Sequence, residues 1–287
     1  MLDPKVFTFL KIVETQSFTK AADELGLTQP AVSQHISKLE QHYHQKLFVT
    51  SNRLVSLTPA GYLFYVYAKQ QIANEKLLID QLSLKKTKLH IGATLSIADY
   101  YLPDILSRMK EENLSEFEIQ VGNTQTLLEK VVQGQLDGAL VEGLFDQSQF
   151  ESIKIHTEKF LGVVSRHHPL SDYPVNFHDL FTYPLILREK GSGTRDILDH
   201  YLNLQNYSYK SFKECYEFGS FVLIKQALMN SQAISFMYEN VAKQEVSDEK
   251  LSFLDIQDYQ LSHSFYFVYS KNTLKKENLI KLLKQFV

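Results

Sequence analysis

The sequence predicts an α/β body preceded by a small all-α domain and a long connecting helix. Residues 17–40 carry two apolar helical patterns separated by a short break at Gly26. After Gly61 no glycine occurs until beyond Leu84, and apolar residues there keep a helical spacing. From residue 85 to the end, strand-like and helix-like segments alternate, which is typical of a mostly parallel sheet covered by helices.

Composition indicates a soluble globular protein with two or three domains. The chain has 287 residues, of which 44% are hydrophobic and 22% charged. Residues 1–87 hold ten Lys and Arg against seven Asp and Glu, and the remainder holds twenty against twenty-six. The sequence therefore predicts a mildly basic head on an acidic body.

Targeting signals and cysteine usage narrow the class further. No apolar run approaches the roughly 20 residues that span a bilayer, and no basic segment followed by an apolar one opens the chain. These features predict a cytoplasmic protein without a membrane partner. Cys215 is the only cysteine, which excludes an internal disulfide and a CxxC metal site, and we expect it to be a small buried side chain.

The stretch SFTKAADELGLTQPAVSQHISKLE, residues 17–40, has the chemistry of a helix-turn-helix. Gly26 can end the first helix, Thr28 can cap the second, and Pro30 lies in the second helix's first turn, where its missing N–H costs little. The apolar faces of the two helices can pack together. The residues expected in that contact are Ala21, Ala22 and Leu25 of the first helix, and Val32, Ile36 and Leu39 of the second.

The outer face of the second helix is polar rather than simply charged, and its side chains suit base edges and phosphates: Gln29, Ser33, Gln34, Ser37 and Lys38. Periodicity alone leaves a helical hairpin with a solvated face as an alternative to a DNA-binding face. Downstream, KLFVTSNRLVSLT reads as a β-hairpin with Thr50, Ser51 and Asn52 in its turn. Such a wing would carry Arg53 to a phosphate or a minor groove.

A long helix is predicted to begin at LTPAG, where Thr58 can cap it and Pro59 can occupy its first position. Its apolar residues keep a heptad-like spacing interrupted by Gln70 and Asp80. We expect the helix to pair with a copy of itself, and packing on its own domain is the alternative. The expected seam is Leu63, Val66, Ala73, Leu77 and Leu84.

The N-terminal motifs, FLKIVETQSFTKAADELGLTQPAVSQHISKLE followed by LF, RLVSLTPAG, resemble the winged helix-turn-helix of the LysR-type transcriptional regulators. The resemblance runs through Gly61 and implies a DNA-binding domain at residues 1–58, a linker and dimerisation helix at 59–87 and an effector-binding domain at 88–287. It also implies the residues that meet double-stranded DNA, which are Thr28, Gln29, Pro30, Ser33, Gln34, Ser37, Lys38 and, in the wing, Arg53.

Three positions depart from the family pattern. Thr50 stands where an arginine is usual after Leu-Phe, which removes a phosphate contact and lowers non-specific affinity. His44 stands where glycine is common. Gln34 replaces an arginine of many members, which changes the base that is read.

The remainder resembles the family's effector domain, which is two Rossmann-like α/β subdomains of periplasmic-binding-protein type joined by two crossover strands. We expect subdomain I at about 88–161 and 267–287, and subdomain II at about 162–266. The expected crossovers lie near residues 160–170 and 263–270. Ligands in such folds lie between the subdomains, at strand ends and helix N-termini.

Polar residues at strand-to-helix junctions are the candidates for that cleft. GATLSIADYYLP, GNTQ, GSGTR and, more weakly, EFGSF supply hydroxyls, an amide and one cation near free backbone N–H groups. Each could instead be an ordinary helix cap. The candidates are Thr94, Ser96, Asn123, Thr124, Ser192, Thr194, Arg195 and Ser220.

Glu142, in LVEG, is a further candidate, and it disfavours a bare anion unless it pairs with Arg195 or contacts an amine or hydroxyl of the ligand. Within the family, GATLSIADYYLP, LDGALVEG and GSGTR are similar to the regulators of sulfur assimilation and the Calvin cycle. The resemblance implies a small polar, anionic effector, a homodimer that assembles into a tetramer, DNA bending, and RNA polymerase as a further partner.

An enzyme and a solute-binding protein without a DNA function are the alternatives. GxxxxGK, GxGxxG and GxSxG are all absent, and His42 with His44, or His167 with His168, lacks the further ligands of a metal site. We expect these histidines at the surface, no cofactor and no metal. A solute-binding protein or an enzyme on this body would leave residues 1–60 without a role.

Overall fold

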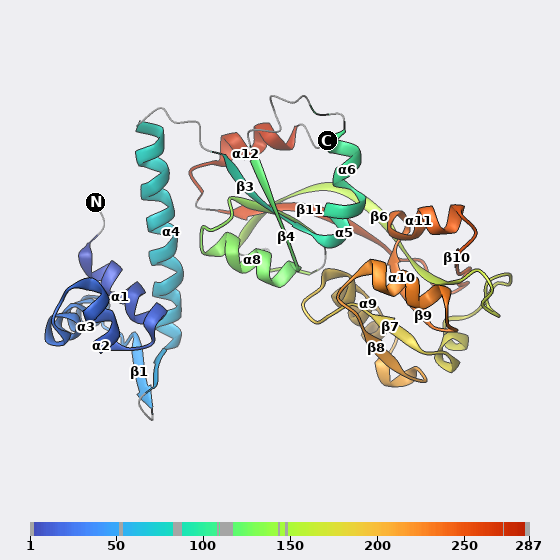
Figure 1. Ribbon diagram of the computed structural model, residues 1–287, viewed down its shortest axis with the longest axis horizontal. Coiled ribbons are helices and arrows are strands. Elements are labelled where there is room, and N and C mark those ends of the chain that lie inside the picture. Colours follow the sequence, from blue (N-terminus) through green and yellow to red (C-terminus); the bar gives the residue numbers. More distant parts are fainter. Residues whose placement is uncertain are drawn as a thin grey trace. The chain divides into compact units, whose positions relative to one another are not determined.

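The computed structural model describes residues 3–51, 54–82, 88–107, 109, 117–142, 144–146, 149–271 and 273–284. Its contacts divide the chain into two compact units. The first unit, here called the head, comprises residues 1–87 with 132–135, and the second, here called the body, comprises residues 88–131 with 136–287 (Figure 1). No helix in the described ranges is long and apolar enough to cross a membrane.

The head begins with three helices whose ends are set by local capping. They are α1 (Pro4–Thr15), α2 (Phe18–Leu25) and α3 (Gln29–Tyr43). Gly26 ends α2 with φ +66°, and the Thr28 hydroxyl accepts a hydrogen bond from the Ala31 N–H at the start of α3. The expected helix-turn-helix is confirmed. Val32, Ile36 and Leu39 are buried with Ala21 and Ala22, but Leu25 is only half-buried.

A β-hairpin follows, formed by β1 (Phe48–Ser51) and β2 (Leu54–Leu57). Its antiparallel register runs from Phe48 opposite Leu57 to Ser51 opposite Leu54. Thr50 and Ser51 therefore lie in the strand rather than in the turn, because ladder pairing continues to the last residue of β1. Asn52 and the predicted wing residue Arg53 lie outside the described residues.

Helix α4 spans Pro59–Leu82, 24 residues, and begins as its capping sequence predicts (Figure 1). The Thr58 hydroxyl accepts a hydrogen bond from the Gly61 N–H at 2.8 Å. Phe64 and Ala68 are buried in the core of the head, where the rings of Phe9 and Phe64 meet edge to face with centroids 4.8 Å apart. This packing ties the start of α4 to α1.

The body is built on one sheet, which holds nine strands within the described ranges. The strand order is β4-β3-β5-β11-β6-β9-β7-β8, and β10 also pairs with β6. β3, β4 and β5 are parallel, and so are β7, β8 and β9. The strands are β3 (Leu89–Thr94), β4 (Phe117–Gly122), β5 (Gly138–Val141), β6 (Phe150–Ser165), β7 (Leu185–Leu187), β8 (Cys215–Glu217), β9 (Ile234–Tyr238), β10 (Leu251–Phe253) and β11 (Ser262–Ser270).

Two long strands, β6 and β11, join the two ends of this sheet and pair antiparallel from Phe150 opposite Ser270 to Lys159 opposite Ser262. β6 begins at Phe150 rather than near residue 160, because its first ten residues find their partners in β11, far along the sequence. We call the part around β3–β5 the first half and the part around β7–β10 the second half.

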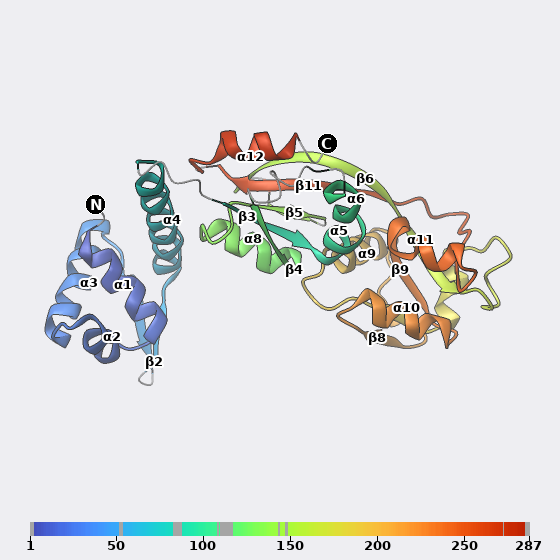
Figure 2. The ribbon, with the colours of Figure 1, turned by 45° about the horizontal axis from the view of Figure 1, so that its top comes forward.

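Helices flank both halves. In the first half, α8 and α12 lie on opposite sides of the sheet (Figures 1 and 2). Its helices are α5 (Leu95–Tyr100), α6 (Leu102–Leu106), α8 (Thr124–Val132) and α12 (Lys276–Leu283). The second half has α9 (Gly193–Leu204), α10 (Phe221–Met229), α11 (Glu239–Ser247) and two short 3-10 helices, η1 (Phe177–Thr182) and η2 (Tyr209–Ser211).

Two expectations about single side chains are wrong. Cys215 is exposed, because β8 is an edge strand whose three residues all face solvent. His168 is buried, whereas His167 is exposed. The His168 Nδ1 accepts from the Leu170 N–H at 3.1 Å and its Nε2 lies 3.2 Å from the Gln232 carbonyl oxygen, so the ring is neutral, and burial lowers its pKa.

Candidate DNA-binding and effector sites

The outer face of α3 carries the side chains expected at DNA. Gln29, Gln34, Ser37 and Lys38 are exposed and Ser33 is half-exposed, while the apolar stripe on the other face is buried. Thr28 and Pro30 are exposed at the helix start. The Gln29 Nε2 donates to the Ser33 Oγ at 3.0 Å, so these two side chains are held together on the outer face.

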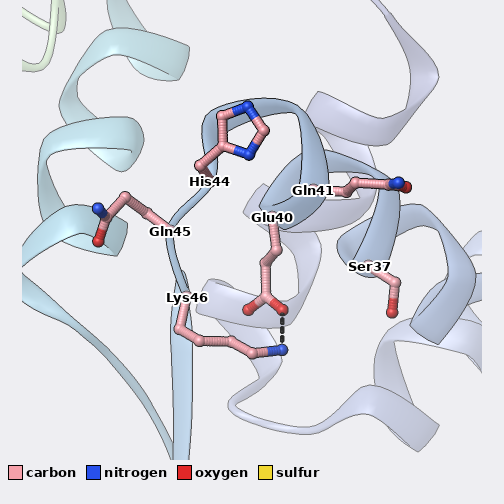
Figure 3. Close-up of a pocket in the computed structure, with 6 residues that line it drawn as sticks. All are labelled: Ser37, Glu40, Gln41, His44, Gln45 and Lys46. Carbon is pink, nitrogen blue, oxygen red and sulfur yellow. Dashed lines mark hydrogen bonds and ion pairs between the residues drawn. The ribbon is translucent and has the colours of Figure 1, made fainter.

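An open pocket of about 340 Å³ lies at the end of α3, where the chain turns toward the wing. Figure 3 shows Glu40 pointing to Lys46 across it, with a carboxylate-to-Nζ distance of 2.6 Å. The other Glu40 oxygen accepts from the Leu47 N–H at 3.0 Å. Glu40 therefore anchors the residues just before β1 to α3. It was not among the predicted site residues. The pocket is lined by Ser37, Glu40, Gln41, His44, Gln45 and Lys46.

His44 has a clear structural setting. It caps the C-terminus of α3 with φ 53°, in the left-handed region, and its N–H donates to the Glu40 carbonyl oxygen. That region costs a non-glycine residue about 1–2 kcal/mol. Glycine adopts this conformation without strain, which is a physical reason for the glycine that is common at this position.

In the body, a buried carboxylate lies at the end of β5. Glu142 is 1% exposed. The Ser96 hydroxyl donates to its Oε1 at 2.8 Å, and the Thr94 hydroxyl donates to its Oε2. Burial raises the pKa of the Glu142 carboxyl, and these two hydrogen bonds, with the charge of Arg188, oppose the shift. The hydroxyls at the turn from β3 into α5 are therefore used in hydrogen bonds to Glu142.

At the neighbouring strand-to-helix junctions, one candidate side chain caps a helix and the others do not. Asn123 is an ordinary cap, because its Oδ1 accepts from the Thr126 N–H at 2.9 Å. The Thr124 hydroxyl instead donates to the Glu142 carbonyl oxygen at 2.9 Å. Thr94, Ser192 and Ser220 all occupy N-cap positions, yet none of their side chains makes a capping hydrogen bond. For these three the capping alternative does not hold.

The two halves of the body meet at the GSG turn before α9. Gly193, the first residue of α9, lies so close to the Glu142 carbonyl and the Thr124 hydroxyl that a Cβ would not fit. Gly191, with φ +83°, lies near the Asn123 and Gln125 side chains. Ser192 and Thr194 are buried and their hydroxyls are 2.9 Å apart. The structure therefore gathers Thr94, Ser96, Thr124 and Glu142 of the first half with Ser192 and Thr194 of the second.

Arg195 does not pair with Glu142. Its guanidinium forms an ion pair with Glu217, donates to the Arg188 carbonyl oxygen at 3.1 Å and lies over the Tyr209 ring. The reason is its place on α9, which aims the side chain toward β8 and η2. Ser220 lies at the start of α10, and no described hydrogen bond links its side chain to the gathered residues.

Arg188 is the cation that sequence reasoning missed. Its side chain is 6% exposed, pairs with Glu189 at 2.8 Å and lies 4.4 Å from the centroid of Phe221. Its charge acts on the pKa of both Glu142 and Asp99. The only signal in the sequence is its position, directly after the three apolar residues of β7 and just before the GSG turn.

Within the described ranges, no three His, Cys, Asp or Glu side chains gather as a metal site would require. A helix-turn-helix head with a wing, joined by a long helix to a two-part α/β body with a polar junction, has the organisation of a DNA-binding regulator that senses a small molecule.

Comparisons with known proteins define the family. Residues 5–62 match the model of the bacterial regulatory helix-turn-helix protein, lysR family, and residues 83–287 match the LysR substrate binding domain. The chain belongs to the LysR family of DNA-binding transcriptional regulators, which confirms the expected family and rules out the enzyme and the solute-binding protein without a DNA function. It combines a helix-turn-helix domain with a substrate-binding effector domain.

Two relatives and one solved structure illustrate the similarity. The transcriptional regulator CysL of Bacillus subtilis is 30% identical over 293 residues, covering 96% of this chain and 95% of CysL. The transcriptional activator CmpR of Synechocystis is 30% identical over 272 residues, covering 92% and 88%. Full-length LysG of Corynebacterium glutamicum with bound effector Arg has a TM-score of 0.69 at 17% identity, covering 100% and 96%.

Proposed function

We propose that this regulator binds a dyad-symmetric promoter site as a homo-oligomer and responds to a small polar, anionic metabolite bound between the two halves of its body. The observation that carries the effector site is the junction at Gly193, where buried polar groups of both halves converge. Three of their hydroxyls, those of Thr124, Ser192 and Thr194, lie together without capping a helix. A few convergent polar groups are what fixes the orientation of a small ligand in its site.

The DNA-binding part rests on the outer face of α3. Gln29, Ser33 and Gln34 lie in its first turns, the part of a recognition helix that reaches base edges. Ser37 and Lys38 follow on the same face and suit phosphates, and Arg53 is proposed to serve the wing. RNA polymerase is proposed as a further partner of the DNA-bound protein.

Replacing Ser33 by Ala tests this assignment. Ser33→Ala removes the acceptor that holds Gln29 and one hydroxyl of the α3 face. We expect specific affinity to fall about fivefold to 150-fold, since one base contact contributes about 1–3 kcal/mol. Fluorescence anisotropy would measure binding to an operator selected from random DNA by the wild type, with non-specific DNA in parallel. Ser107→Ala, at an exposed serine of the body, is the control. Equal specific-to-non-specific ratios for both variants and the wild type would contradict the assignment.

The homo-oligomer is proposed to form through α4. Four exposed apolar side chains of α4 lie on one face, at helical spacings of 4, 11 and 4 residues. They are Leu63 (72% exposed), Tyr67 (49%), Leu78 (49%) and Leu82 (76%). A second copy of this chain would cover them, and pairing of the bodies would then give a tetramer that bends DNA.

This face differs from the seam expected from the heptads. Leu63 belongs to both, but Leu77 is buried, Val66 and Ala73 are half-buried, and Leu84 lies outside the described residues. The heptad spacing by itself does not show which face of α4 packs against the rest of the head. In the structure the face that includes Phe64 and Ala68 packs into the head, so the exposed stripe is displaced around the helix.

Placing charged side chains in the exposed stripe tests the proposed oligomer. The double variant Leu63→Glu, Leu82→Glu places like charges on a face that is proposed to be buried between copies, and each buried charge costs several kcal/mol. We expect association to weaken at least a hundredfold in sedimentation velocity. Lys76→Glu, exposed on a different face of α4, is the matched control and should leave association unchanged. An unaltered oligomer in the double variant would rule out this face.

A further inference from the structure

Glu142 determines the chemistry of one side of the proposed effector site. Each of its carboxylate oxygens accepts one hydroxyl, from Thr94 and from Ser96. Two groups that could have held an anionic ligand are therefore used by the protein's own carboxylate. A carboxylate has about four lone-pair positions, so Glu142 can accept further donors.

The Glu142 carboxyl has no direct cationic partner. Within the described part of the chain it forms no ion pair. Arg188 acts on it only at longer range, because the Nε and Nη2 of that guanidinium donate to Glu189 and its plane lies over Phe221. On the side of the site formed by the first half, the Glu142 carboxyl can therefore accept hydrogen bonds but has no paired cation.

The second-half side presents the opposite chemistry. Ser192 and Thr194 are 3% and 2% exposed, and their hydroxyls bond to each other. One of the two hydrogens is used in that bond, and the other has no acceptor among the described residues. A buried donor without an acceptor is costly, and a ligand oxygen would remove that cost. Gly193, between the two residues, contacts the Glu142 carbonyl, so the donor side adjoins the acceptor side.

We infer that the effector is a zwitterion, with an ammonium group for Glu142 and a carboxylate or sulfonate for the Ser192–Thr194 pair, as in an α-amino acid or an amino sulfonate. This inference rests on the effector site proposed above and adds an ammonium group to the anionic group proposed for its ligand. A bare anion would either keep Glu142 protonated or lie beside a buried carboxylate without a counter-charge, where repulsion is strong because the surroundings are poorly polarisable. An ammonium group at the same place supplies the missing counter-charge.

Isothermal titration calorimetry on the full-length protein tests the inference. The probes are the twenty standard L-amino acids and taurine, with inorganic sulfate and des-amino analogues such as propionate for alanine and 3-hydroxypropionate for serine. We expect at least one amino compound to bind the wild type, and its des-amino analogue and sulfate to bind at least tenfold more weakly. Glu142→Gln should weaken the amino compound at least tenfold and strengthen sulfate or the analogue.

The alternative outcomes separate the two proposals. Sulfate or a des-amino acid binding the wild type as tightly as any amino compound would overturn the zwitterion and leave the anion site standing. Absence of binding of every amino compound to the wild type would overturn the zwitterion as well. An amino compound unaffected by both Glu142→Gln and Ser192→Ala would bind elsewhere and overturn both proposals. Melting temperatures check that the variants fold. Should Glu142→Gln not fold, a tenfold loss in Ser192→Ala places the compound in this site, and the tenfold preference of the wild type for the amino compound over its des-amino analogue decides for the zwitterion.

Discussion

Gly193→Ala is expected to destabilise the body by about 1–3 kcal/mol and to weaken effector binding at least tenfold. The added Cβ would meet the Glu142 carbonyl and the Thr124 hydroxyl of the other half, at 2.8 Å for the hydroxyl oxygen. A backbone carbonyl cannot swing aside as a long side chain can, so the two halves must shift apart. That shift separates Ser192 and Thr194 from Glu142.

Urea unfolding and calorimetric titration with an effector found in the screen would measure both effects. Gly219→Ala is the matched control, because it lies in the same half and its Cβ would have only the Glu189 Oε2 nearby, at an ordinary 3.8 Å. We expect the control to stay within about 0.5 kcal/mol of the wild type. If Gly193→Ala were as stable and as responsive as Gly219→Ala, the junction at Gly193 would not be the effector site.

Gly61→Ala is expected to have the largest effect on the head, a loss of about 2–4 kcal/mol in the free energy of unfolding. Its Cβ would press on the Leu47 carbonyl and approach the Leu57 side chain at 3.1 Å. The Leu47 carbonyl oxygen accepts from the Thr58 N–H at 3.0 Å, a bond that joins the start of the wing to the start of α4. Its displacement should misplace the wing and lower specific DNA affinity more than tenfold.

Gly26→Ala is the control that distinguishes the effect of the close contact at Gly61 from the general effect of replacing a glycine. Gly26 has φ +66° with open space around its Cβ position, so the variant costs only the left-handed conformation, about 1 kcal/mol, and should retain DNA affinity. Thermal unfolding and the operator titration would compare the two variants. Equal stability losses would show that the Leu47 contact is not important for the head.

Prediction from sequence succeeded where the signal was local. The turn at Gly26, the Thr28 cap and the start of α4 at Pro59 each depend on residues within one helical turn, so the sequence alone specifies them. The alternation of strands and helices predicted the α/β body for the same reason.

Prediction failed where a residue's environment comes from a distant segment. β6 begins at Phe150 because β11 pairs with it, and Thr50 belongs to a strand because Val55 lies opposite. Cys215 is exposed because its strand takes the edge of the sheet. Arg195 of α9 pairs with Glu217 of β8, and no local pattern contains that information.

The effector site shows the same division. The sequence indicated which junctions carry hydroxyls, and it indicated that Glu142 would conflict with a bare anion. It did not show that Thr94 and Ser96 both bind that carboxylate, or that Arg188 is the nearby cation.

By itself, then, the sequence determined the family of this protein, its helix-turn-helix and the identity of most polar groups in its body, because capping and periodicity act over a few residues. Tertiary structure alone decided which face of α4 is left for a partner and which hydroxyls Glu142 occupies. Both depend on segments far apart in the chain, whose apposition at Phe64 and at Gly193 is set by packing.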